Sequence, residues 1–240
     1  MILKVENLKK QFGNFIAVNN ISFEMKSGDR IGIIGPNGSG KTTMVEMLAG
    51  VSQPTKGKIK YGFQDTDSPK EFIGIQFQNS NYPSGLTVKD IIAFGRNIRK
   101  LKDISNDELK KMLKVFRMEN IYKKKIRSLS GGEKQRINIL LSIIHNPKIV
   151  ILDEISTGLD IASREDIISF TDKLLEERKM SLLLISHHME EIRALCKKVI
   201  FIYEGKIQEH DSIKNIEKKY GSLETCATRT LFEETNASNV

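Results

Sequence analysis

The stretch Gly35-Pro36-Asn37-Gly38-Ser39-Gly40-Lys41-Thr42, followed by Thr43, decides how the rest of this chain is organised. Two glycines separated by four residues and followed by Lys and Thr form the pattern of a phosphate-binding loop. The apolar residues 31–34 before it predict a strand, and apolar residues at helical spacing after it predict a helix. The loop therefore lies between a strand and a helix, as its chemistry requires.

Each residue type in this loop suits an anion. Glycines let the backbone bend and bring its N–H groups close to phosphate oxygens, because no Cβ stands in the way. The N-terminus of the following helix carries a positive partial charge. Lys41 can reach the β- and γ-phosphates, and the Thr42 hydroxyl can bind Mg²⁺. The alternative is an ordinary glycine-rich turn with an incidental lysine.

Composition places the chain among ordinary globular proteins and argues against nucleic acid as a partner. Charged residues make up 28% and hydrophobic residues 39% of the 240 positions, and the formal net charge is +8. Short lysine clusters occur at residues 9–10, 123–125 and 218–219, without interleaved aromatic residues that would stack on bases. We therefore expect a solvated, lysine-rich surface and no nucleic-acid partner.

No segment predicts a membrane span or a secretory signal. The longest apolar run, residues 137–144, is too short to cross a bilayer and contains Asn138 and Ser142. The first six residues lack a basic segment followed by a long apolar core. Cys196 and Cys226 have no metal-binding spacing and are expected to be reduced thiols. These features predict a cytoplasmic protein, so work at a membrane would require another chain.

The remaining chain alternates short strands with helices, apart from one long helical segment. Strand patterns occur at residues 2–6, 20–26, 58–61, 72–76, 149–152, 182–185 and 199–203. From about residue 86 to 128 the chain instead has a helical, lysine-rich pattern, with Thr87 and Ser105 as candidate N-caps. We therefore expect an α/β fold that carries a helical insertion.

Polar residues follow two of the predicted buried strands. Asp153 and Glu154 end the apolar run 149–152, and unpaired buried carboxylates are costly, which favours a functional reading. Asp153 can hold Mg²⁺, and Glu154 can polarise an attacking water. His187 follows the run 182–185 and is expected at the carboxyl end of the sheet, where ligands bind in open α/β folds.

Two further features each allow two interpretations. Ser130-Gly131-Gly132 offers backbone donors at a helix N-terminus, which suits phosphate, but Ser130 with Glu133 also forms an ordinary capping box. Phe12 can stack on an adenine ring, but a buried loop phenylalanine explains it equally well.

Taken together, these motifs resemble the ATP-binding subunit of an ABC transporter. Residues 35–42 match the Walker A loop, residues 149–154 the Walker B strand with its catalytic carboxylate, and residues 129–135 the family signature. Gln78 matches the Q-loop glutamine, residues 156–160 the D-loop, His187 the switch histidine, and Phe12 the A-loop aromatic residue. Glu133 stands where the family more often has Gln, and Ile155 where Pro is frequent.

The resemblance implies a P-loop NTPase fold, with a RecA-like core, an antiparallel β subdomain and a helical subdomain inserted at about 86–128. The ATPase domain would span 2–210 and be followed by a tail over 211–240. ATP and Mg²⁺ would be the cofactors. The implied site residues are as follows: catalytic Lys41, Gln78, Glu154 and His187; metal-binding Thr42, Gln78 and Asp153; nucleotide-binding Phe12, Gly35 to Thr43, Ser130, Gly131 and Gly132.

The implied partners are a second ATPase subunit, identical or related, and an integral membrane permease that holds the chain at the inner face of the membrane. In the family each signature loop closes on the other subunit's ATP. The short helical insertion and residues 154–160 resemble exporters of drugs, peptides or lipid-like substrates more than nutrient importers. The alternative is a soluble ABC ATPase that acts in iron–sulfur assembly or on ribosomes and nucleic acid.

Overall fold

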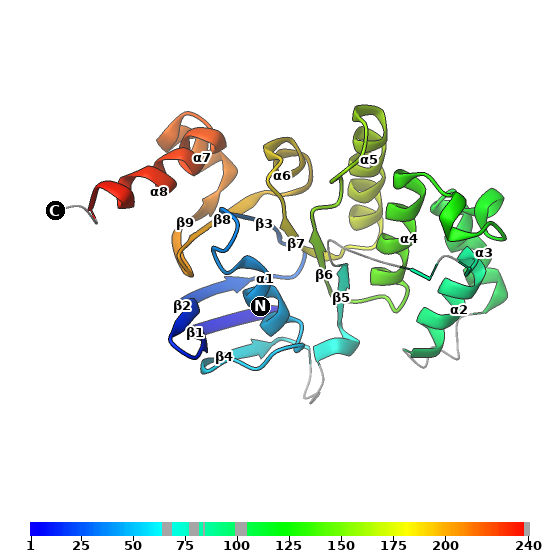
Figure 1. The fold of residues 1–240 in the computed structure, drawn as a ribbon, viewed down its shortest axis with the longest axis horizontal. Coiled ribbons are helices and arrows are strands. Elements are labelled where there is room, and N and C mark those ends of the chain that lie inside the picture. Colours follow the sequence, from blue (N-terminus) through cyan, green and yellow to red (C-terminus); the bar gives the residue numbers. More distant parts are fainter. Residues whose placement is uncertain (64–68, 77–81, 84, 99–104, 238–240) are drawn as a thin grey trace.

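A computed structural model of the protein describes residues 1–63, 69–76, 82–83, 85–98 and 105–237. It is an α/β structure with two sheets and a helical layer at one side (Figure 1). Within the described residues, no helix is both long and apolar enough to span a membrane.

The central sheet has six strands in the order β5-β6-β7-β3-β8-β9. All neighbouring pairs are parallel except β8 and β9, which form an antiparallel edge. Every residue of β6 and β7 is buried, as expected for strands covered on both faces. The strands are β3 (Arg30–Ile34), β5 (Ile73–Gln76), β6 (Ile149–Asp153), β7 (Ser181–Ile185), β8 (Lys198–Tyr203) and β9 (Lys206–Ser212).

A three-stranded antiparallel sheet in the order β2-β1-β4 lies beside the central one. Its strands are β1 (Leu3–Phe12), β2 (Phe15–Met25) and β4 (Lys56–Tyr61). Buried side chains of β1, β2 and β3 share one hydrophobic cluster with helix α1 (Lys41–Leu48). This packing holds α1 between the two sheets.

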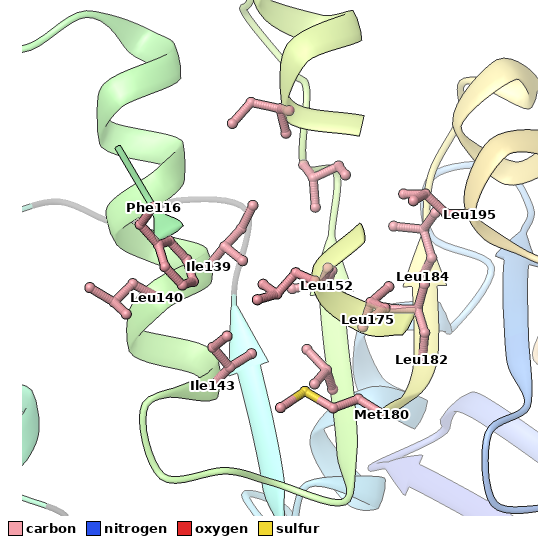
Figure 2. Packing of buried hydrophobic residues seen from close by; sticks show 14 of the residues in the cluster. Phe116, Ile139, Leu140, Ile143, Leu152, Leu175, Met180, Leu182, Leu184 and Leu195 are labelled. Carbon is pink, nitrogen blue, oxygen red and sulfur yellow. The ribbon is translucent and has the colours of Figure 1, made fainter. Parts of the chain in front are cut away.

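The helical layer packs on the side of β5 and β6 (Figure 1). A larger hydrophobic cluster joins these helices to the central sheet, and Figure 2 shows it between α4, β6 and β7. Phe116, just after α3, contacts Phe170 of α5 edge-on, with ring centroids 4.9 Å apart. The helices of the whole described chain after α1 are α2 (Val88–Ile98), α3 (Asn106–Val115), α4 (Gly131–Ile143), α5 (Ile161–Glu177), α6 (Met189–Leu195), α7 (Ile213–Tyr220) and α8 (Leu223–Ala237), with short 3₁₀ turns at Pro69–Glu71, Glu119–Ile121 and Ile126–Ser128. Of these, α7 and α8 lie on the opposite side, near β8 and β9 (Figure 1).

The helix starts agree with the capping signals in the sequence. The Thr87 hydroxyl accepts the backbone N–H of Asp90 at the start of α2, at 3.2 Å. Ser105 caps α3 and Ser130 caps α4, each in a complete capping box with the Glu three residues later. These local signals therefore predicted the starts of α2, α3 and α4 correctly.

The first strand is longer than the sequence pattern predicts. The apolar alternation stops at residue 6, but β1 continues to Phe12. Asn7 has a φ of 50°, and the pairing register with β2 shifts between Val5 and Leu8. An irregularity of this kind interrupts the two-residue period without ending the strand, which explains the shorter prediction.

The C-terminal helices are attached to α6, the helix that follows His187. Arg193 of α6 donates to Glu217 of α7 at 3.0 Å. The same guanidinium forms two hydrogen bonds to Glu224 of α8, at 2.8 and 2.7 Å. This pair of parallel bonds fixes geometry better than a single contact does.

Candidate active site

The predicted phosphate-binding loop connects β3 to α1, as the sequence indicated. Gly40, the residue before α1, has a φ of 98°. A Cβ at Gly40 would lie 2.1 Å from the backbone oxygen of Ala17 in β2, so a larger residue would push the loop off that strand. The backbone N–H of Gly205, in the β8–β9 turn, donates to the backbone oxygen of Ser39 at 3.0 Å. Neighbouring strands therefore hold the loop in shape.

Lys41 folds back over this loop. Its Nζ donates to the backbone oxygens of Gly35 at 2.7 Å and of Pro36 at 2.8 Å. Burial lowers the pKa of Lys41, while the nearby carboxylates of Asp153 and Glu154 oppose that effect. The ammonium group therefore lies at the phosphate-binding loop, where it and the loop can contact the same anion.

A cavity of about 610 Å³ brings the predicted residues of three chain segments together. These segments are the phosphate-binding loop with the start of α1, the end of β6 with Glu154, and the end of β7 with His187. The lining residues are Phe15, Ala17, Asn37, Gly38, Gly40, Lys41, Thr42, Thr43, Asp153, Glu154, Ile185 and His187. Gly35, Pro36 and Ser39 belong to the same loop but are not part of the lining. Gln78 lies outside the described residues.

Glu154 is oriented by two contacts from different loops. Its Oε1 lies 3.2 Å from Nε2 of His187, and its Oε2 accepts a hydrogen bond of 2.9 Å from the Thr157 hydroxyl. Its backbone N–H donates to Ile185 at 2.8 Å, and its φ of 51° is unusual for a residue with a side chain. A carboxylate fixed in this way beside an anion-binding loop can accept a proton from water.

Asp153 and Thr42 offer oxygen atoms that suit Mg²⁺. Burial and the neighbouring Glu154 raise the pKa of Asp153 to about 6, and Lys41 opposes that rise. A bound cation would favour the ionised carboxylate. Among the described residues no group of three or more His, Cys, Asp or Glu could hold a metal. Mg²⁺ commonly takes one or two protein oxygens together with phosphate oxygens, so this donor set fits that ion.

The segment Ser130-Gly131-Gly132 does not line this cavity. Ser130 and Gly131 are exposed, and the Ser130 hydroxyl caps α4. A Cβ on Gly131 would lie 2.8 Å from Cδ2 of Leu159, which places this segment beside residues 156–160. The capping interpretation is therefore confirmed, and the segment lies outside the cavity lined by Lys41 and Glu154.

The aromatic residue at the cavity is Phe15, whereas the sequence interpretation chose Phe12. The two residues pair across the β1–β2 hairpin, on either side of Gly13 and Asn14. Phe15 lines the cavity, while Phe12 is outside the lining and lies under Nζ of Lys10, 5.1 Å from the ring centroid. Both are exposed, so neither is the buried loop phenylalanine that we weighed as the alternative.

Comparison with known proteins identifies the family. Residues 18–157 match the family model described as ABC transporter, which is more than half of the chain. This chain belongs to the ABC transporter family. The matched span of the ABC cassette contains the phosphate-binding loop, the Ser130–Gly132 segment and the Asp153–Glu154 pair.

Relatives of this ABC cassette include subunits named for import and for resistance. A probable sulfate/thiosulfate import ATP-binding protein of Chlorella vulgaris is 30% identical over 220 residues, 90% of this chain and 93% of that protein. The linearmycin resistance ATP-binding protein of Bacillus subtilis is 34% identical over 215 residues, 86% of this chain and 68% of that protein. Other importer subunits are longer, and the chain spans 61% of their length.

A solved structure agrees with the fold. A dimeric ATP-binding cassette in a post-hydrolysis state with ADP and Pi superimposes with a TM-score of 0.76 at 26% identity, covering 88% of this chain and 98% of that one. The ABC cassette described here is accordingly an ATP-binding subunit with the ATPase fold, built on a RecA-like core as predicted.

Phe15 and Phe12 form a matched pair for testing which ring contacts the base. They are the same residue type, in the same hairpin, with exposed fractions of 62% and 52%. Loss of base stacking costs about 1–3 kcal/mol, so Phe15→Ala should raise the Kd for ATP by roughly tenfold. Phe12→Ala should change it by less than about twofold, since less than 0.4 kcal/mol is lost. Titration with a fluorescent ATP analogue measures both; the reverse order would show that Phe12 holds the base.

Proposed function

We propose that this chain powers an ABC exporter by hydrolysing ATP in the cavity between α1, β6 and β7. One observation carries the proposal. Lys41 of the phosphate-binding loop is far in the sequence from the pair Asp153 and Glu154, yet all three line one cavity. Thr42 and His187 complete the set. An anion cradle, a pair of oxygen ligands for Mg²⁺ and a positioned carboxylate are the parts that phosphoryl transfer to water requires.

In the proposed reaction a water attacks the γ-phosphoryl group in line with the bond that breaks. Lys41 and the loop N–H groups neutralise the charge that develops on the phosphate oxygens. Glu154 accepts the proton of the attacking water, and His187, 3.2 Å from its carboxylate, contacts the γ-phosphate. Mg²⁺, held by Asp153 and Thr42, would neutralise phosphate charge.

We further propose that the working unit contains two ATPase subunits. The Ser130–Gly132 segment is outside its own cavity, and Ser130 and Gly131 are exposed at the start of α4, where a helix N-terminus favours an anion. Ile161, the first residue of the neighbouring α5, is 76% exposed, which suits a face that a second subunit covers. In this arrangement Ser130, Gly131 and Gly132 of each subunit contact the ATP bound by the other.

A membrane permease is the other proposed partner, and α2 is its proposed docking element. Tyr82 and Leu86, which precede α2, pack against the main hydrophobic cluster, and the Tyr82 hydroxyl donates to Asn138 at 2.6 Å. Phe94 and Ile98, one helical turn apart on α2, are 62% and 64% exposed. An exposed apolar pair at this spacing suits a groove that receives a helix of the permease.

The direction of transport is proposed from the more similar of the relatives described above. The subunit named for linearmycin resistance is 34% identical to this chain, against 30% for the sulfate/thiosulfate import subunit. This difference supports export of a drug-like, peptide-like or lipid-like substrate, in agreement with the resemblance of residues 154–160 to exporters.

A site composed of the cavity of one subunit and the Ser130–Gly132 segment of the other, here called the composite site, predicts a dimer that depends on ATP. Glu154→Gln removes the carboxylate but keeps its shape, so hydrolysis should slow by on the order of a hundredfold or more while ATP still binds. The closed dimer should then accumulate with Mg-ATP, as seen by size-exclusion chromatography with light scattering. Adding Ser130→Arg should abolish the dimer, because a bulky side chain enters the partner's phosphate site.

Residue Lys173, exposed on α5, supplies the control for the second substitution, since Lys173→Arg in the Glu154→Gln background should leave the dimer intact. A negative result with the isolated subunit is repeated on the complex with the permease. Normal hydrolysis by Glu154→Gln there, or ATP-driven closure that survives Ser130→Arg, would contradict the composite site.

Deleting the gene tests the direction of transport. A strain without it should become more sensitive to at least one amphiphilic antimicrobial and grow normally on limiting sulfate or spermidine, because export removes compounds from the cell. The wild-type gene should restore resistance and Lys41→Ala should not. Poor growth on the limiting nutrient, with unchanged sensitivity, would instead assign import.

A further inference from the structure

A buried carboxylate lies directly behind the catalytic loops. Glu191, in the first turn of α6, is fully buried. Its Oε2 accepts a hydrogen bond of 2.6 Å from the Ser186 hydroxyl, and its Oε1 accepts one from the Ser156 hydroxyl. Both serines are also fully buried. Glu191 therefore joins the loop after β6 to the loop after β7.

This buried bridge repeats, one residue along each loop, the bridge that Glu154 makes in the cavity. Thr157 follows Ser156 and donates to one oxygen of Glu154, and His187 follows Ser186 and lies beside the other. The two carboxylates thus connect the same two loops at two levels. One level faces the cavity, and the other lies in the interior.

The bridge also orders the backbone at the switch histidine. The Ser186 hydroxyl, which donates to Glu191, accepts a hydrogen bond of 3.0 Å from the backbone N–H of His188. The path from Glu191 to the turn that carries His187 therefore consists of two hydrogen bonds. Displacing Ser186 would change the position of the imidazole relative to Glu154.

Stability alone does not account for a carboxylate at this position. Among the described residues, Glu191 takes part in no salt bridge. Burying a charge without an opposite charge is expensive, and hydroxyl donors compensate only part of that cost. A carboxylate does, however, accept at two oxygens at once and so can fix two loops relative to each other.

We propose that Glu191 is a positioning residue for ATP hydrolysis. It holds Ser156 and Ser186, and through them it keeps Thr157 and His187 at the two oxygens of Glu154. This inference rests on the proposed roles of Glu154 and His187. A change at Glu191 should therefore slow turnover through Thr157 and His187 and leave the phosphate-binding loop intact.

The test compares Glu191→Gln with Glu190→Gln, its exposed neighbour on the same helix. Gln keeps the size of the side chain but replaces one of the two carboxylate oxygens with an NH₂ group, which is a donor. The serine hydroxyl that donated to that oxygen loses its acceptor, so one hydrogen bond is lost. In the full-length chain, Glu191→Gln should lower kcat by roughly tenfold, since small misplacements of catalytic groups are costly. The Kd for ATP should stay within about twofold, because the cradle around Lys41 is unchanged. Glu190→Gln should match the wild type.

A double variant separates positioning from a general structural role. In a background that carries both His187→Ala and Thr157→Val, Glu191→Gln should lower kcat by less than about twofold, because both groups that it positions are already absent. If Glu191→Gln instead gives the same tenfold loss there, or weakens ATP binding as much as it lowers kcat, the positioning role is wrong.

Two milder variants keep the test decisive if Glu191→Gln does not fold. Ser156→Ala and Ser186→Ala each remove a single hydroxyl and should each lower kcat by roughly threefold or more, with ATP affinity retained. Unchanged kcat in both would overturn the inference. If the wild-type chain hydrolyses ATP and Glu191→Gln is equally active, only this inference is refuted. If the wild-type chain does not hydrolyse ATP even with its partners present, the proposed function is refuted as well.

Discussion

The parallel pairing of β3, β7 and β6 is the constraint on which the site depends. Ile185, the last residue of β7, pairs with Ile33 of β3 on one side and with Asp153 of β6 on the other. The phosphate-binding loop, the carboxylate pair and the loop that carries His187 therefore begin at the same level of the sheet. Parallel strands end at one edge, so three segments far apart in the sequence share one cavity.

The loops at this edge are held from behind by the rest of the fold. Gly40 packs on the backbone of β2, and Glu191 connects the loops after β6 and β7. Arg193, on the same short helix as Glu191, joins the two C-terminal helices. His187 and the Ser130 segment are exposed, but the loops that carry the site are supported from behind by this packing and these hydrogen bonds, which favours precise placement of Glu154.

Local signals made most of the fold predictable. Capping boxes at Ser105 and Ser130 and the glycine pattern ending at Gly40 depend on neighbours within a few residues, so the sequence shows them directly. The aromatic residue at the cavity was not predictable in this way. Whether Phe12 or Phe15 faces it depends on hairpin register, which the irregularity at Asn7 alters. The contacts that Glu191 and Glu154 make between the loops after β6 and β7 were not predictable either, because they depend on which loops become neighbours in the folded chain.

The central claim is that the cavity around Lys41 binds the phosphates of ATP, and equilibrium binding to Lys41→Ala tests it most directly. Isothermal titration with Mg-ATP compares the wild type, Lys41→Ala and Lys173→Ala, the last being an exposed lysine on α5. Losing a hydrogen bond from a charged donor costs about 1.5–3 kcal/mol, so Lys41→Ala should raise Kd roughly 10- to 100-fold. Lys173→Ala should bind like the wild type, and equal affinity for all three would contradict the claim.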